Sequence, residues 1–274
     1  MMNAASREAL ATLRERLDAL SGRFSTGEGR IGLAGELYSV ARLLSNEPRL
    51  RRTIADPASD PQSRGELING LVDGKVSASA AELVRLAAEQ RWSAPWDLVD
   101  ALEQVADDAL FTAAESESQL DEVEDELFRF ERILDGQPSL TTLLDAAAVQ
   151  PARRIELLRS LLAGKVTGVT MELLEHAVGS SRKRNIELTI DRLLEAAAQR
   201  KERSIARVVS AVDLNAEQES RIATALAAIY GRPMSVRTEI DPGVRGGLVI
   251  RVGDEVIDGS VASRFAAVRK ALAS

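Results

Sequence analysis

Apolar residues recur every three or four positions over roughly the first 200 residues of the chain, which is the period of an amphipathic helix. Residues 5–20 carry one such stripe, and residues 120–134 carry another. After residue 203 the pattern changes, because β-branched and alternating apolar positions become frequent. Three segments are typical of strands: 205–212, 236–240 and 247–252. The pattern therefore predicts a mainly α chain that ends in a small α/β domain.

Polar side chains mark several expected boundaries. Ser118, followed three residues later by Asp121, has the spacing of a capping box and predicts a helix start. Asn215 with Gln218 predicts the start of another helix, which ends near Tyr230.

Turns that contain glycine precede the last two expected strands, at residues 243–247 and 253–254. Gly253 and Asp254 form a two-residue connection that favours a type II′ hairpin into a strand at 256–257. Ser260 is expected to cap a final amphipathic helix, which carries Phe265, Val268 and Leu272 at helical spacing.

Part of the chain is repeated. When the chain is shifted by 90 residues without a gap, residues 36–90 lie over residues 126–180, and about a third of the positions are identical. The identical pairs include Pro48 and Pro138, Pro61 and Pro151, Arg64 and Arg154, Glu66-Leu67 and Glu156-Leu157, and Gly74-Lys75-Val76 and Gly164-Lys165-Val166. Shared helical composition does not place prolines and a Gly-Lys-Val triplet in one register, so we infer a duplication.

The repeat defines the expected organisation of the chain. We predict two tandem helical bundles, of which residues 1–104 form the first copy and residues 105–203 the second. Residues 204–274 are expected to form the small α/β domain.

Charge and composition exclude several classes of protein. The chain has 42 acidic and 35 basic residues, and its net charge of -7 disfavours binding to nucleic acids or to anionic lipid. It has no cysteine, which excludes disulfides and thiolate catalysis. Charged residues are spread through the first 20 positions, unlike a secretory signal, and no apolar run reaches the roughly 18 residues that a bilayer requires. We therefore expect a soluble chain.

The glycines at 243–247 are the first candidate for chemistry. They could cradle a phosphate, or clamp RNA as the Gly-x-x-Gly loop of KH domains does. A Walker loop requires a following lysine and a helix, and the KH loop lies between helices, whereas these glycines lead into a predicted strand. A turn that needs positive φ is the favoured interpretation.

The other candidates also have a structural interpretation that we favour. His176, the one histidine, lies among apolar residues on a helix of the second bundle and is expected to be packed or half-exposed. The acidic run 115–126 lacks calcium-loop spacing and is expected to be a solvated helix face. Trp92 and Trp96 are expected on one helix, in the core or at an interface. The basic clusters 182–184 and 200–203 could contact an acidic partner but are favoured as helix-end charges. No cofactor or metal site is expected.

The C-terminal segment resembles the signature of the delta subunit family of F-type ATP synthase, which includes the mitochondrial oligomycin-sensitivity-conferring protein. The family pattern has two glycines, an apolar strand, Gly-Asp, an apolar pair, Asp-x-Ser and an amphipathic helix. The matching residues are Gly246, Gly247, Gly253, Asp254, Asp258, Ser260, Phe265, Val268 and Leu272. Residues from about 105 to the end resemble one family member, and the additional first copy departs from the family pattern.

The resemblance implies a non-catalytic stator function. It implies that the helical part binds the N-terminal segments of the α subunits and that the C-terminal domain binds the b subunits. The chain would then act at the cytoplasmic face of the cell membrane, as a peripheral protein that reaches the membrane only through partners and binds no nucleotide directly. The glycine signature residues would permit the turns, Asp258 and Ser260 would cap the last helix, and Phe265, Val268 and Leu272 would pack it or meet the b subunits.

Two other function classes stay open on the sequence alone. One is an all-α adaptor that binds RNA or another protein, which the net charge of -7 disfavours for RNA. The other is an enzyme that uses the glycine turn to hold a phosphate.

Overall fold

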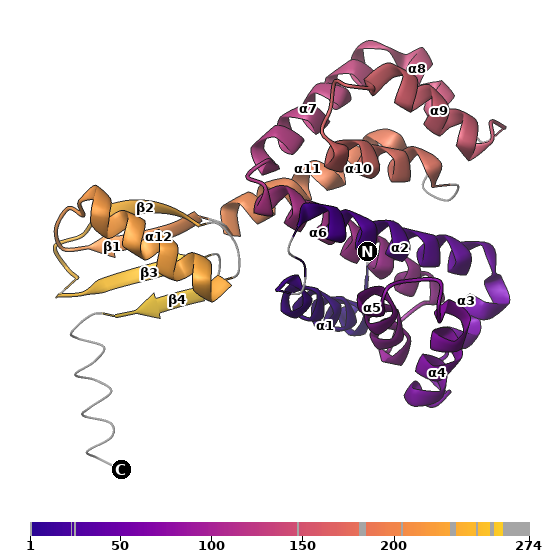
Figure 1. Ribbon diagram of the computed structural model, residues 1–274, viewed down its shortest axis with the longest axis horizontal. Coiled ribbons are helices and arrows are strands. Elements are labelled where there is room, and N and C mark those ends of the chain that lie inside the picture. Colours follow the sequence, from indigo (N-terminus) through magenta and orange to yellow (C-terminus); the bar gives the residue numbers. More distant parts are fainter. Residues whose placement is uncertain are drawn as a thin grey trace. The chain divides into compact units, whose positions relative to one another are not determined.

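The chain forms two compact units, Met1–Leu194 and Glu195–Ser274. The computed structural model describes residues 2–22, 24, 26–146, 148–180, 185–203, 205–230, 234–244, 246–252 and 255–259. Figure 1 shows helices in the first unit, and in the second a sheet with α12 beside it and the end of α11. The predicted mainly α fold with a small C-terminal α/β part is confirmed.

The first unit contains the helices α1 to α10 and the beginning of α11. Their bounds are α1 Ala4–Ser21, α2 Gly27–Asn46, α3 Pro48–Ile54, α4 Pro61–Val72, α5 Ala78–Glu89, α6 Pro95–Ser116, α7 Leu120–Gly136, α8 Pro138–Leu144, α9 Pro151–Leu162, α10 Gly168–Gly179 and α11 Ile186–Arg203. Its core is built mainly from leucine, valine and alanine side chains, and α6 is buried around most of its circumference.

The duplication is visible in local structure. The helices α3, α4 and α5 correspond to α8, α9 and α10 with bounds shifted by the same 90 residues. Two side-chain contacts recur with the same shift: Glu36 accepts hydrogen bonds from the backbone and side chain of Ser77, and Glu126 accepts them from Thr167. Each contact secures the first turn of α5 or α10 to α2 or α7.

The predicted boundary between the two copies, at residues 104 and 105, falls inside a helix. α6 continues from Pro95 to Ser116, and it contacts α1 and α2 from the first copy and α7 and α10 from the second. α2 also contacts α10 directly. The division into two separate bundles stays a prediction. Helices from both copies of the repeat pack against the same helix, α6.

The connection between α6 and α7 corrects one prediction. Ser118 does not cap α7, which begins at Leu120 after Gln119 and has no side-chain cap. Instead Ser118 has a positive φ of 58°, and its backbone N–H bonds Glu115 while that of Gln119 bonds Ala114. This is a Schellman motif, so Ser118 ends α6.

The second unit is a four-stranded mixed sheet, in the order β2-β1-β3-β4, with α12 beside it. The bounds are β1 Ile205–Ser210, α12 Ala216–Tyr230, β2 Ser235–Ile240, β3 Leu248–Val252 and β4 Glu255–Asp258. β1 and β2 are parallel, so α12 is the crossover between them, and β3 pairs antiparallel with β1 and β4. A small core forms from Ala206, Leu226, Met234 and Val252.

The capping and strand signals in the sequence agree with the structure of the second unit. Asn215 and Gln218 each accept a hydrogen bond from the other's backbone N–H, at 2.9 and 3.0 Å, which confirms the capping box at the start of α12. The three predicted strands are present, and Val252 pairs with Glu255, as a hairpin with a two-residue connection requires.

Candidate partner-binding surfaces

Acidic side chains on α6 are buried and reach three other helices. Asp108 accepts a hydrogen bond from Arg14 Nε of α1 at 2.7 Å, and Asp107 accepts one from the Tyr38 hydroxyl of α2 at 2.5 Å. Glu103 Oε1 lies 3.8 Å from Nε2 of His176 on α10. Because buried carboxylates are costly unless they are paired, the hydrogen bonds of Asp107 and Asp108 specify how α2 and α1 sit on α6.

Tyr38 and His176 form the centre of this junction. Their rings stack with centroids 3.7 Å apart and planes inclined by 12°. Burial, and then the neighbouring carboxylate of Asp107, raise the pKa of Tyr38 well above its usual value, so the hydroxyl stays protonated and donates. Arg192 of α11 lies 3.5 Å from Asp107 and balances part of its charge.

A cavity of about 450 Å³ opens beside the junction, and α2, α6, α9 and α10 line it. Its wall includes Arg42, Glu172 and Glu175 together with the Tyr38–His176 pair. Burial, followed by the nearby Glu175 carboxylate, raises the pKa of Glu172. Within the described residues, no group of three potential ligands for a metal ion comes together. The arrangement joins helices from the two sequence copies.

His176 is partly buried and stacked on Tyr38, which confirms the prediction of a packed or half-exposed side chain. Tyr38 and His176 lie 138 positions apart in the chain and come from different copies of the repeat, so no local pattern links them. In the second copy, Phe128 takes the place of Tyr38 and is 49% exposed.

Two other interpretations of the helical unit need correction. The acidic run 115–126 is not a uniformly solvated face, because Glu115 and Glu126 are buried. Trp92 is buried, as expected, but it lies in the connection before α6, and its indole N–H bonds the carbonyl of Ala87 at 2.8 Å. Trp96 is on α6, with the Arg51 guanidinium 3.5 Å above its ring. Basic cluster 182–184 lies outside the described residues.

The glycine signature forms a turn before β3. Gly246 and Gly247 have φ values of 66° and 89°, which L side chains rarely adopt. Just upstream, Asp241 accepts a hydrogen bond from the N–H of Gly243 at 2.8 Å, and its own N–H bonds Ser210 at the end of β1. Since Gly247 is followed directly by a strand, the loop lacks the helix N-terminus of a Walker site.

Of the remaining signature residues, Asp258 lies within the described part of the chain. Asp258 ends β4 and pairs with Val249, and Gly259 donates to the Leu248 carbonyl at 2.9 Å to close the hairpin. The others, Gly253, Asp254, Ser260, Phe265, Val268 and Leu272, lie outside the described residues. The roles expected for them as turn, cap and packing residues stay predictions.

Exposed apolar side chains on the second unit offer surfaces for partners. They are Val212, Ile229, Ile240, Val256 and Ile257, between 37% and 67% exposed. Val256 and Ile257 are consecutive in β4, so they point to opposite faces of the sheet. Across the described part of the chain, no helix combines the length and apolar character that a membrane crossing needs.

Comparison with known proteins identifies the family. The family model "ATP synthase delta (OSCP) subunit" matches residues 107–272. ATP synthase subunit delta of Streptomyces griseus is 45% identical over 264 residues, which cover 96% of this chain and 97% of that protein. The proteins of the same name from Streptomyces coelicolor and Salinispora arenicola are 44% and 42% identical over 273 residues, which cover 100% of this chain and 99% of each.

These relatives match the additional N-terminal copy as well as the part that the family model covers. The chain therefore belongs to the ATP synthase delta (OSCP) family, whose members are non-catalytic subunits of the peripheral stalk of F-type ATP synthase.

Proposed function

We propose that this stalk subunit joins the α subunits of the catalytic head to the b subunits, and so resists the torque of the rotor during proton-driven ATP synthesis. The helical unit binds N-terminal segments of the α subunits, and the C-terminal unit binds the b subunits. The subunit then works at the cytoplasmic face of the cell membrane. Family membership over the whole chain is the observation that carries this proposal.

Two structural features support the assignment of different partners to the two units. The chain has two compact units, so two partners can be held by separate surfaces. Exposed apolar side chains occur on both units, for example Leu43 and Phe128 on the first and Val256 on the second. A stator link that uses several modest contacts gains strength from their combination.

The test uses the intact, tagged chain. It is expressed in its own organism and recovered from the membrane fraction at moderate salt, and the bound proteins are identified by mass. Recovery of α, β and b subunits is expected. Recovery without any ATP synthase subunit contradicts the proposal.

Because the chain has no cysteine, single cysteines can then map each partner. A photo-crosslinker is attached at exposed positions of the helical unit, such as Leu43, Arg129 and Ser160, and at Val256 in β4. We expect α crosslinks from the helical unit and b crosslinks from Val256. The reverse distribution overturns the assignment of partners but leaves the stator function intact, and the unsubstituted chain is the control.

A further inference from the structure

His176, the single histidine of the chain, lies where helices from the two sequence copies meet. It is on α10, its ring stacks on Tyr38 of α2, and its Nε2 lies 3.8 Å from Oε1 of Glu103 on α6. That distance is too long for a hydrogen bond but within the range of an ion pair. The contact with Glu103 is therefore attractive mainly when the imidazole carries a proton.

The site is accessible to protons although it is mostly buried. The side chain of His176 is 15% exposed and lines the cavity of about 450 Å³, whereas the side chain of Glu103 is 6% exposed. Histidine is the side chain whose charge ordinarily changes between about pH 5 and pH 8. The junction of the two copies thus contains a group that can change its charge near physiological pH.

Three further features favour the protonated imidazole. His176 lies in the last turn of α10, where the helix dipole attracts a cation. Glu172 lies one turn earlier on the same helix and lines the same cavity, and a carboxylate four residues before a cation is stabilising. The nearly parallel ring of Tyr38, 3.7 Å away, provides a cation–π contact.

The other charged groups around α10 leave the cavity with an excess of negative charge. They are Arg42 on α2, Asp107 on α6, Glu126 on α7, Arg159 on α9, Glu175 on α10 and Arg192 on α11. Asp107 is paired with Arg192, Glu175 with Arg159, and Glu126 bonds Thr167 at the other end of α10. Among the described residues that line the cavity, Arg42 therefore faces two carboxylates, Glu103 and Glu172. A proton on the imidazole supplies the second positive charge.

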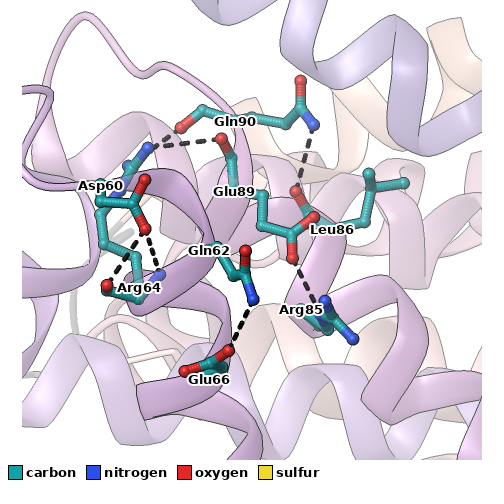
Figure 2. Close-up of polar contacts among 9 residues, drawn as sticks. Asp60, Gln62, Arg64, Glu66, Arg85, Leu86, Glu89 and Gln90 are labelled. Atoms are coloured by element: carbon teal, nitrogen blue, oxygen red, sulfur yellow. Dashed lines mark hydrogen bonds and ion pairs between the residues drawn. The ribbon is translucent and has the colours of Figure 1, made fainter.

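The first copy provides an internal reference, because Leu86, which cannot titrate, takes the place of His176. In Figure 2 the Leu86 carbonyl accepts a hydrogen bond from Gln90 Nε2 at 3.2 Å. Arg64 donates to the carbonyls of Glu89 and Gln90 at this end of α5, at 3.3 and 3.1 Å. Since an arginine keeps its charge throughout the physiological range, α5 should not respond to pH there.

We propose that His176 is a proton-operated contact between the two sequence copies. When the imidazole takes up a proton, it forms an ion pair with Glu103 and a cation–π contact with Tyr38, and α10 is held more tightly against α6 and α2. This stabilisation is fully present below the pH at which histidine titrates in the unfolded chain, and it is lost as the pH rises through the titration in the folded chain. The helical unit therefore becomes more rigid when its surroundings acidify, whichever subunits it binds.

The first experiment follows the ring of His176 by NMR. The full chain carries a tag without histidine, so every imidazole signal belongs to this residue. The titration midpoint of the unsubstituted chain is expected at a higher pH than that of Glu103→Gln. The matched control is Glu66→Gln, because Glu66 is exposed on α4 and bonds Gln62, and its midpoint should equal that of the unsubstituted chain. Equal midpoints in all three proteins overturn the inference.

The second experiment measures hydrogen exchange of α10 in the full chain at about pH 6 and about pH 8, corrected for the intrinsic pH dependence of exchange. Slower corrected exchange at the lower pH is expected in the unsubstituted chain, and no difference in His176→Gln or in α5. Equal protection of α10 at both pH values in the unsubstituted chain overturns the inference, and so does a pH effect that persists in His176→Gln. Circular dichroism melting checks that each variant is folded. If Glu103→Gln is not, Glu103→Asp, which draws the carboxylate back from the ring, replaces it.

Discussion

The hydroxyl of Tyr38 should contribute measurably to the stability of the helical unit. Tyr38→Phe removes one oxygen and leaves the stacked ring in place, so the hydrogen bond to Asp107 is the main loss. Tyr38 and Asp107 are 4% and 6% exposed, so water does not readily replace the donor. Hydrogen bonds to charged groups contribute about 1.5–3 kcal/mol, and we expect a loss of about 2 kcal/mol in the free energy of unfolding.

Urea titration and thermal melting measure this loss. For a unit of this size, about 2 kcal/mol corresponds to a fall of roughly 4–8 °C in Tm. Tyr230→Phe is the matched control, because the Tyr230 hydroxyl donates to Glu255 at 2.8 Å at an exposed site. Exposed substitutions of this kind usually change stability by less than about 0.5 kcal/mol.

The pH dependence provides an independent check. The pKa of Tyr38 is raised well above 10.0 in the folded chain, so the folded state keeps a proton that the unfolded state loses. The stabilisation is fully present below the unfolded pKa and is lost as the pH rises through the folded pKa. The stability difference between the unsubstituted chain and Tyr38→Phe should therefore shrink above about pH 10. Equal stability of the two proteins at pH 7 would refute the buried hydrogen bond.

Two further predictions concern the repeated loops and the buried arginine. Arg64→Met should lower the free energy of unfolding by about 3 kcal/mol in urea titration, because it leaves the three carbonyls that Arg64 binds without their donor. Gly74→Ala and Gly164→Ala should each cost about 1–2 kcal/mol, since φ is 67° and 70° at these positions, whereas Gly70→Ala in the helix α4 should stabilise by about 0.5–1 kcal/mol. Equal effects at all three glycines, measured in the same titrations, would contradict the φ argument.

Local chemistry explains which parts of the fold could be predicted from the sequence. The Asn215–Gln218 capping box and the strands of the second unit are specified by residues close together in the chain. Ser118 shows how a local signal can mislead, because a serine suits a capping box but here adopts the left-handed conformation that ends α6. The spacing of Trp92 and Trp96 predicts that both lie on one helix, but α6 begins only at Pro95.

The junction in the helical unit could not be predicted, because its members are far apart in sequence. Asp107 and Asp108 look like solvated residues of an acidic helix, and their partners Tyr38 and Arg14 lie 69 and 94 positions away. The repeat itself can be predicted from the sequence, because its prolines and its Gly-Lys-Val triplet recur in one register.

α6 explains why the duplicated chain is suited to a stalk under torque. Two bundles joined by a flexible linker would rotate about it, and a load on one would reach the other only after the linker was taut. α6 instead has 22 residues, about 33 Å at the rise of an α-helix, and contacts helices of both copies along its length. Its buried carboxylates fix the orientation of α1 and α2, and α10 packs against the same helix. One continuous helix therefore links the two copies, so that a force applied to either copy reaches the other without a hinge at α6.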